Sequence, residues 1–409
     1  MRTNDRLAAL LAGIVMLFCG AGCSSGDSSA AEAASSGEAT SSTAAEAPSE
    51  EAEDFGSMTT AEIVADMKLG WNLGNSLDVC NADRNGDGQI DENAETVDET
   101  LWGNVLTTKG IFEKLKEDGF NAVRIPVTWR DHMDEDYNVD AAWMDRVQEV
   151  VDYAYDLDMY VILNVHHDGG GDPQFGAWIR NASRDYEGTL EKYKALWSQI
   201  AERFAGYGER LIFESMNEVG FDDLDETSAF DTLNKLNQEF VDLVRGSGGN
   251  NDKRHLLIAG YWTDIEKTCS SKYKMPEDPA DSLILSVHYY TPWEFCTTTI
   301  NRTWGTDSEL KQMQRLISKL SRTYCEKGVP VIIGEFGTGV WNETASGVYF
   351  SENLVKLCRE AGIAAFMWDD GGQFDRFSYD WRYPELVEAF DRAVNGGDYE
   401  VVKEGDSAS

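Results

Sequence analysis

Two glutamates, Glu218 and Glu335, each close a short apolar run, and these runs lie far apart in the chain. A facing pair of carboxyl groups is the equipment for cleaving a glycosidic bond. One acid must donate a proton to the departing oxygen, while the other, ionised, attacks or supports the anomeric carbon. Two further residues lie in or directly after other apolar runs: Arg124 would keep Glu335 anionic, and Tyr290 would donate a hydrogen bond to it.

Polar or aromatic residues also mark most of the other apolar runs. Asn217 precedes Glu218 and could bind a sugar 2-hydroxyl, a contact that strengthens as charge develops. Three histidines could orient sugar hydroxyls and the acid: His166, His167 and His288. Asn75 and Trp368 follow or end two more runs. Each residue alone has an ordinary structural explanation, but agreement among seven runs predicts one shared site.

The elements that must position these residues are eight short apolar runs that alternate with longer amphipathic ones. The predicted strands are 69–73, 122–126, 160–164, 211–214, 256–259, 283–287, 331–334 and 364–368. The predicted helices are 107–118, 140–157, 190–204, 227–245, 308–327, 351–361 and 384–394, with Thr107 as an N-cap and Gly119 as a C-terminal stop.

This alternation predicts an α/β fold, a single (β/α)8 TIM barrel, whose active site lies at the C-terminal ends of the strands. A doubly wound sheet is the alternative. It would need a glycine-rich phosphate-binding turn after its first strand, and residues 70–74 lack that spacing.

The composition restricts the class of ligand that the protein is expected to bind. The 409 residues carry a formal net charge of -38, which argues against a nucleic-acid partner because such a partner needs a basic face. The 12 Trp and 16 Tyr suit a flat, weakly charged ligand such as a sugar, although most of them are expected in the core. Five body cysteines remain after the N-terminal segment, an odd number, so at least one is unpaired within the chain.

The N-terminal segment is predicted to be a targeting signal followed by a tether. Basic residues precede an apolar run at 7–18, too short to cross a bilayer, and small residues then precede Cys23. Residues 1–22 are interpreted as a signal peptide. Cys23 would be lipidated and attach the protein to the membrane, with ordinary cleavage and secretion as the alternative, so an extracellular or cell-surface location is expected.

The tether and the remaining segments complete the predicted organisation. Residues 23–57 are rich in Ser, Ala and Glu and contain no Lys or Arg, so we expect a disordered acidic linker. The catalytic domain is predicted over 58–397, with a flexible tail at 398–409. We expect a monomer.

A loop between the first two predicted strands has the spacing of a calcium-binding EF-hand loop. Its oxygen-bearing candidates are Asp83, Asn85, Asp87, Gln89 and Asp91, with Gly88 at the turn and Ile90 after Gln89. Ala94 occupies the position of the usual bidentate acid, which Glu95 or Glu92 would replace. The loop is predicted to hold a structural Ca2+, with a solvated acidic loop as the alternative.

Six stretches make the chain resemble family 5 of the glycoside hydrolases, the cellulase family of clan A. These stretches are 70–75, 122–127, 161–168, 213–218, 287–292 and 333–337, and they follow the family's order over residues 58–397. The resemblance implies a retaining double displacement, with Glu218 as acid/base and Glu335 as nucleophile. Six other positions match the family's active site: Arg124, His166, Asn217, His288, Tyr290 and Trp368. Val219 departs from a common proline without touching the chemistry.

The stretch Glu99-Thr100-Leu101-Trp102-Gly103-Asn104 is similar to a bacterial endoglucanase subgroup with broad β-glucan and xyloglucan specificity. We therefore expect an endo-β-1,4-glucanase that acts on cellulose-type, mixed-linkage or xyloglucan polysaccharides. Trp102, Trp178 and Trp293 are candidate sugar platforms, with core or rim positions as the alternative. β-Mannanase and xylanase activity remain open, as does a non-catalytic glycan-capture lipoprotein.

No cofactor is expected for catalysis. The adjacent His166 and His167 are expected not to chelate one metal together from a single strand face.

Overall fold

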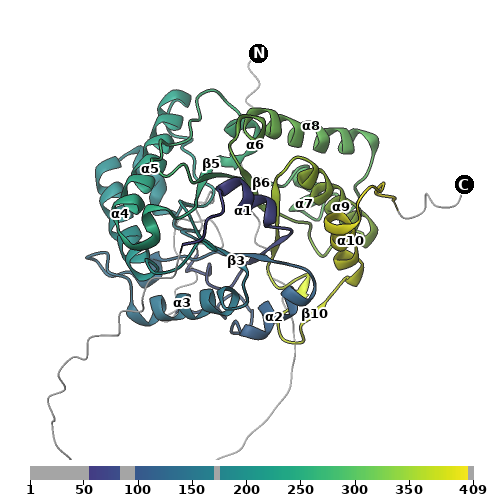
Figure 1. Ribbon diagram of the computed structural model, residues 1–409, viewed down its shortest axis with the longest axis horizontal. Coiled ribbons are helices and arrows are strands. Elements are labelled where there is room, and N and C mark those ends of the chain that lie inside the picture. The colour runs from purple at the N-terminus through teal and green to yellow at the C-terminus, as the bar shows by residue number, and fades with distance from the viewer. Residues whose placement is uncertain (1–54, 83–96, 170–175, 404–409) are drawn as a thin grey trace, which may run out of the picture.

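The computed structural model describes residues 55–82, 97–169 and 176–403. Eight parallel strands close into a barrel in chain order, and the larger helices surround it (Figure 1). The strands are β1 (Gly70–Leu73), β2 (Ala122–Ile125), β3 (Tyr160–Asn164), β4 (Leu211–Glu214), β5 (Leu256–Asp264), β6 (Leu283–Tyr289), β7 (Val331–Phe336) and β8 (Ala364–Asp369). The predicted (β/α)8 barrel is therefore confirmed, and all eight predicted strands are present.

The seven predicted helices are also present. They are α2 (Lys109–Glu117), α3 (Ala141–Tyr155), α4 (Tyr186–Arg203), α5 (Glu226–Gly246), α8 (Asp307–Thr323), α9 (Thr344–Glu360) and α10 (Pro384–Asn395). Two of them, α4 and α9, begin four or more residues earlier than predicted. Asp185 caps α4 by accepting from the Gly188 amide, and glycines in the first turns of α4 and α9 weaken the helical pattern there.

One predicted cap is wrong. The N-cap of α2 is Thr108 rather than Thr107, and the Thr108 hydroxyl lies 2.8 Å from the Tyr379 hydroxyl instead of capping the helix. Thr107 is buried one residue earlier, where its amide donates to Glu99. Gly119 ends the helix region with a left-handed backbone, φ 93°, as expected.

A short helix, α6 (Ile265–Thr268), follows β5 directly. Several other short elements were not predicted. They are the helices α1 (Thr60–Asp66) and α7 (Trp293–Cys296), the hairpin strands β9 (Phe374–Asp375) and β10 (Asp380–Trp381), and the 3-10 turns at Arg130–His132, Trp178–Ser183, Gly249–Asp252 and Cys325–Lys327. Their length explains the omission, because a segment of two to seven residues is too short for a clear hydrophobic period.

Helix α1 closes one end of the barrel. Thr59 and Glu62 form a reciprocal capping box at its start, and Ile63, Val64 and Met67 pack against the barrel interior. In Figure 1 this purple helix lies across the centre of the ring of helices. The end that α1 covers is therefore unavailable to a ligand, which leaves the opposite end for the site.

The barrel interior has two layers. The lower layer, next to α1, is apolar and includes Ile162, Ile212, Leu257, Ile284 and Ile332. Two residues further along β3, β4 and β6, and so on the same face, polar residues of an upper layer follow the isoleucines. This upper layer consists of Asn72, Arg124, Asn164, Glu214 and Ser286, and all five are fully buried.

Other sequence expectations can be compared with the described residues. The five cysteines there, Cys80, Cys269, Cys296, Cys325 and Cys358, are all free thiols. No helix within the described ranges combines the length and apolar composition that a membrane crossing needs. The predicted signal peptide, Cys23 and nearly all of the linker lie outside the described residues.

Candidate active site

Arg124 is the centre of a buried polar network at the C-terminal end of the barrel. Its Nε donates to Glu214 at 2.6 Å, and its Nη1 donates to Glu335 at 2.7 Å and to Asn72 at 3.0 Å. Its Nη2 donates to the side-chain oxygen of Asn217 at 2.9 Å. The Asn217 amide nitrogen therefore remains oriented as a donor. The predicted ion pair between Arg124 and Glu335 is confirmed.

Glu218, which follows β4, and Glu335, on β7, are brought together. One carboxylate oxygen of each, with one nitrogen of His288, all lie within 4.8 Å of one another. His288 Nδ1 is 2.8 Å from Glu218 and 3.5 Å from Glu335. The register between β6 and β7 shifts after Val287, and His288 then pairs with Glu335 across the two strands. Such irregularities re-aim side chains near sites.

The Glu335 carboxylate is held by groups from several strands. Besides Arg124, the Tyr290 hydroxyl donates to it at 3.1 Å. Burial raises the pKa of Glu335, while His288 and Arg124 act to lower it and Glu218 acts to raise it further. Burial also raises the pKa of Tyr290 well above its ordinary value, so the phenol stays protonated and can donate. The predicted hydrogen bond from Tyr290 is confirmed.

His166 has a defined proton position. Asn164 accepts from the Val127 amide through its side-chain oxygen, so its amide nitrogen is the donor toward Glu214 and His166 Nδ1, each at 3.1 Å. Burial lowers the pKa of His166 well below its usual range, which keeps the ring neutral. A neutral ring that accepts at Nδ1 carries its proton on Nε2, so His166 is a hydrogen-bond donor at that atom.

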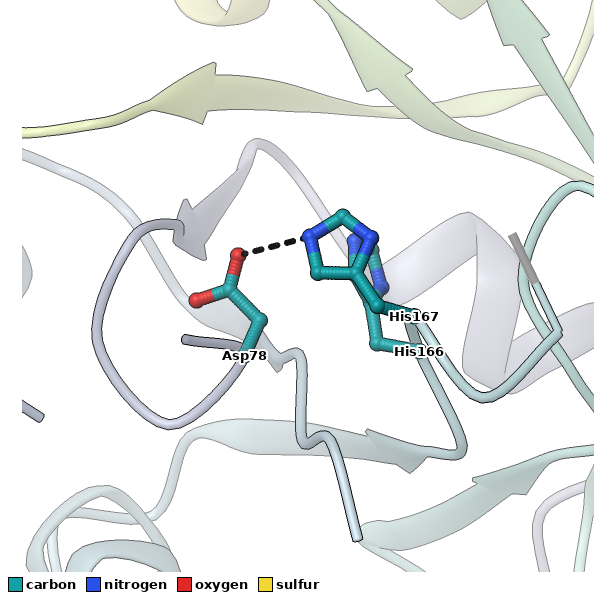
Figure 2. Close-up of side chains that lie close together, drawn as sticks. All are labelled: Asp78, His166 and His167. Atoms are coloured by element: carbon teal, nitrogen blue, oxygen red, sulfur yellow. Dashed lines mark ion pairs between the residues drawn. The ribbon is translucent and has the colours of Figure 1, made fainter. Parts of the chain in front are cut away.

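The two neighbouring histidines lie closer than the sequence analysis expected. Figure 2 shows Asp78 facing His167, with His166 beside it, and a nitrogen of each ring lies within 4.8 Å of an Asp78 oxygen. The premise that adjacent histidines cannot approach one ligand position together is therefore wrong. A metal would still need the lone pair of His166 Nε2, which carries the proton. With Asn164 donating to its Nδ1 and its own proton on Nε2, His166 offers a hydrogen-bond donor rather than a metal ligand here.

Asp78 is a buried carboxyl that the sequence analysis did not select. Its Oδ1 accepts from the Ser76 amide at 2.8 Å, whereas its buried Oδ2 has no hydrogen-bond partner among the described residues. The 3.8 Å from Oδ2 to His167 Nε2 exceeds a hydrogen bond. Burial raises the pKa of Asp78 to about 6, so this group titrates near neutral pH.

Aromatic side chains surround this cluster. Trp368 stacks on His166, with ring centres 5.6 Å apart, and a Cβ at Gly74 would lie 2.6 Å from the Trp368 ring. Trp102 lies beside His167, with ring centres 5.6 Å apart. Asn75 has a left-handed backbone, φ 54°, and its carbonyl accepts from the Asn104 side chain.

The other two candidate platforms are half-buried. Trp178 donates through its indole nitrogen to Asp168 at 2.6 Å, and the Lys192 ammonium lies 4.5 Å from its ring centre. The Lys192 contact therefore leaves at most one face of Trp178 for a ligand. Trp293 begins α7, four residues after the end of β6.

Comparison with known proteins decides the family. The model of the cellulase family, glycosyl hydrolase family 5, matches residues 83–373. The chain belongs to this family. Endoglucanase 1 of Ruminococcus albus is 37% identical over 346 residues, which cover 80% of each protein.

Two solved structures agree with this assignment. A GH5-4 broad specificity endoglucanase from an uncultured bovine rumen ciliate has a TM-score of 0.75 and 37% identity, covering 83% of this chain and 99% of that one. A GH5-4 broad specificity endoglucanase from Ruminococcus champanellensis with bound cellotriose has a TM-score of 0.74 and 34% identity, with the same coverage.

Membership in family 5 makes the protein a glycoside hydrolase with no need of a catalytic cofactor. The glycan-capture alternative, which required a non-catalytic barrel, is set aside. The six calcium-ligand candidates, Asp83, Asn85, Asp87, Gln89, Asp91 and Glu95, lie outside the described residues.

Most of the buried polar layer beneath the family 5 site was not predicted from the sequence. The missed residues with the clearest contacts are Asn164, Glu214 and Ser286 of the upper layer and, outside that layer, Asp78. Asn164 and Glu214 carried a usable signal, since each ends a predicted strand two residues after an isoleucine and therefore faces the barrel interior. Asp78 carried none, because it lies in a loop after β1.

Proposed function

We propose that the protein is an endo-β-1,4-glucanase that hydrolyses internal bonds of cellulose-type, mixed-linkage β-glucan or xyloglucan chains by a retaining double displacement. The observation that carries this proposal is the position of Glu218 and Glu335, with one oxygen of each within 4.8 Å. Retaining enzymes hold their two carboxyl groups about 5–5.5 Å apart, whereas inverting enzymes leave about 6.5–9.5 Å for a water molecule.

The first step uses both glutamates. Glu335, ionised beside Arg124, attacks the anomeric carbon and forms a glycosyl ester, while Glu218 donates its proton to the departing glycosidic oxygen. Tyr290 and Arg124 hold the attacking carboxylate in place. In the second step Glu218, now ionised, takes a proton from water. That water attacks the same carbon and releases Glu335.

The surrounding donors fit a sugar in the cleavage position. Asn217 keeps its amide nitrogen oriented as a donor because Arg124 occupies its oxygen. His166 offers its Nε2 proton, and Trp368 is fixed by stacking on that histidine. Hydrogen bonds to hydroxyls beside the reacting carbon gain strength as positive charge develops on the ring.

The proposed substrate range is based on similar proteins of known structure, not on the geometry of the barrel. The bovine rumen and Ruminococcus champanellensis enzymes are both described as broad specificity endoglucanases, and the latter holds cellotriose. Trp102, Trp178 and Trp293 are proposed as platforms for sugar units beyond the cleavage point. Selection between glucan, mannan and xylan rests on a few hydroxyl contacts.

Replacement of the nucleophile tests the proposal. Glu335→Gln should abolish release of reducing sugar from barley β-glucan, carboxymethyl cellulose and xyloglucan, while the melting temperature shows that the protein remains folded. Glu343→Gln, an exposed glutamate eight residues later, is the matched control and should retain activity. Turnover by Glu335→Gln close to that of the wild type would overturn the assignment. Faster hydrolysis of glucomannan or xylan than of every β-glucan would instead identify the protein as a mannanase or xylanase of the same family.

Location and calcium binding are proposed from the sequence alone. Lipidation of Cys23 would hold the enzyme at the outer cell surface, and Cys23→Ser should lose incorporation of labelled palmitate and release the enzyme into the medium.

For the loop at 83–95, added Ca2+ should raise the melting temperature and a chelator should lower it, with both effects lost in Asp87→Ala. The same melting temperature under all three conditions would favour a solvated acidic loop.

A further inference from the structure

The buried layer beneath the catalytic pair contains a third carboxylate, Glu214, that the proposed mechanism does not use. It ends β4, four residues before Glu218, and its side chain is fully buried. Both oxygens of this carboxylate accept directed hydrogen bonds. Its Oε2 accepts from Arg124 at 2.6 Å and from Asn164 at 3.1 Å, and its Oε1 accepts from Ser286 at 2.7 Å.

These contacts join four strands around one charge. Arg124 lies on β2, Asn164 ends β3, and Ser286 lies on β6, two residues before His288. Through Asn164 the network also reaches Nδ1 of His166 and fixes the proton on its other nitrogen. Glu214 therefore contacts the supports of the nucleophile and of the neighbouring histidine, while it lies too deep to touch substrate itself.

Arg124 is the link between Glu214 and Glu335. Its one positive charge lies between two buried carboxylates, with Nε on Glu214 and Nη1 on Glu335. The charged or titratable groups that face Glu335 are Arg124 on β2, Glu218 after β4, and His288 and Tyr290 on and after β6. Among the described residues, Arg124 is the only charged side chain that contacts Glu214 directly.

We infer that Glu214 is a positioning residue that shares the charge of Arg124 with the nucleophile Glu335 and orients the guanidinium toward it. This inference rests on the proposed function, because it takes Glu335 as the nucleophile. A guanidinium whose charge acted on Glu335 alone would stabilise the ionised carboxylate more strongly. The carboxylate would then be a weaker base and a weaker attacking group. Glu214 keeps Glu335 reactive by drawing part of that charge away.

A burial-only role makes a different prediction. Glu214 could simply satisfy the hydrogen bonds of the barrel interior, and its loss would then lower stability without altering the titration of Glu335. The two roles separate in the acid limb of the pH profile of kcat/KM, which reports the ionisation of the nucleophile in the free enzyme. Thermal stability alone does not separate them.

The informative variant is Glu214→Gln. Glutamine has the same shape, its oxygen can accept from Arg124 and Asn164, and its amide can donate to Ser286 once that hydroxyl turns. The variant removes the charge while keeping the bonds. We expect the acid limb to move to lower pH by on the order of one unit and kcat/KM at its optimum to fall by up to about 10²-fold.

Ser286→Ala is the matched control. It removes one hydrogen bond from the same carboxylate and leaves the charge in place. We expect a lower melting temperature with the acid limb at its wild-type position. Glu214→Asp keeps the charge but withdraws it from Arg124, so it should shift the acid limb in the same direction by a smaller amount. This variant replaces Glu214→Gln if the glutamine variant does not fold.

An unmoved acid limb in the folded Glu214 variant would overturn the inference, and so would an equal shift in Ser286→Ala. Neither result would affect the assignment of Glu335, which is tested separately by Glu335→Gln. Activity in Glu335→Gln would instead refute the proposed function and the inference together.

Discussion

The two layers of the barrel interior differ in chemistry although the same strands build both. Ile162 and Ile212 face α1 in the lower layer, and two residues later Asn164 and Glu214 face the site in the upper layer. Burial of apolar surface stabilises the first layer. Directed hydrogen bonds and one shared positive charge hold the second. A strand can therefore supply stability and chemistry separately, since alternate residues point to the same face.

Replacement of Arg124 is expected to have the largest effect on the upper layer. Arg124→Met removes the charge between Glu214 and Glu335 and leaves both carboxylates buried without a cation. We expect kcat/KM to fall about 10³-fold and the free energy of unfolding to fall by about 3–5 kcal/mol. Hydrolysis of barley β-glucan and urea unfolding measure the two effects. Activity within tenfold of the wild type would show that the upper layer is not part of the catalytic support.

The lower layer should show the opposite pattern. Ile212→Ala leaves a cavity beneath Glu214, two residues earlier on β4. We expect the free energy of unfolding to fall by about 2–5 kcal/mol, because the packed interior cannot fully close around the missing atoms. Where the protein remains folded, kcat should stay close to its wild-type value. A loss of kcat comparable to that of Arg124→Met would mean that the two layers are coupled.

A smaller effect with a defined pH dependence is expected at Asp78. Its folded pKa of about 6 lies above its ordinary value of 3.8 because the carboxyl is fully buried. Its contribution to stability is therefore complete below pH 4 and is lost as the pH rises through 6. Asp78→Asn should match the wild type near pH 4 and be more stable near pH 7, by at most about 3 kcal/mol.

Denaturant unfolding across this pH range measures the Asp78 effect. Asp136→Asn, an exposed acid, is the control and should follow the wild-type curve at every pH. A constant difference between Asp78→Asn and the wild type across the range would contradict the assignment of a raised pKa to Asp78.

The sequence predicted the residues at the mouth of the site better than the buried residues that hold them in place. Glu218, Glu335, Arg124 and Tyr290 were found because their types are unusual at the ends of apolar runs. Glu214 and Asn164 end such runs as well, but their roles depend on partners from other strands. Partners of this kind are set by barrel register, which includes irregularities at the ends of β5, β6 and β7. Local pattern carries no information on register.

Two further features were out of reach of the sequence, one because of register and one because of element length. The proton position on His166 follows from a chain of bonds through Val127, Asn164 and Glu214. Helix α1 was missed because its seven residues are too few for a periodic signal, although it closes the barrel. Long, strongly periodic elements were predicted correctly, since their burial repeats over several turns.

Glu218 and Glu335 are proposed to cleave the bond by double displacement, and the anomeric configuration of the first product tests this mechanism. Proton NMR during hydrolysis of a cello-oligosaccharide in D2O resolves the two anomers before they interconvert. The close carboxylate pair predicts that the β-anomer appears first and the α-anomer grows only by mutarotation. Initial formation of the α-anomer would contradict the account.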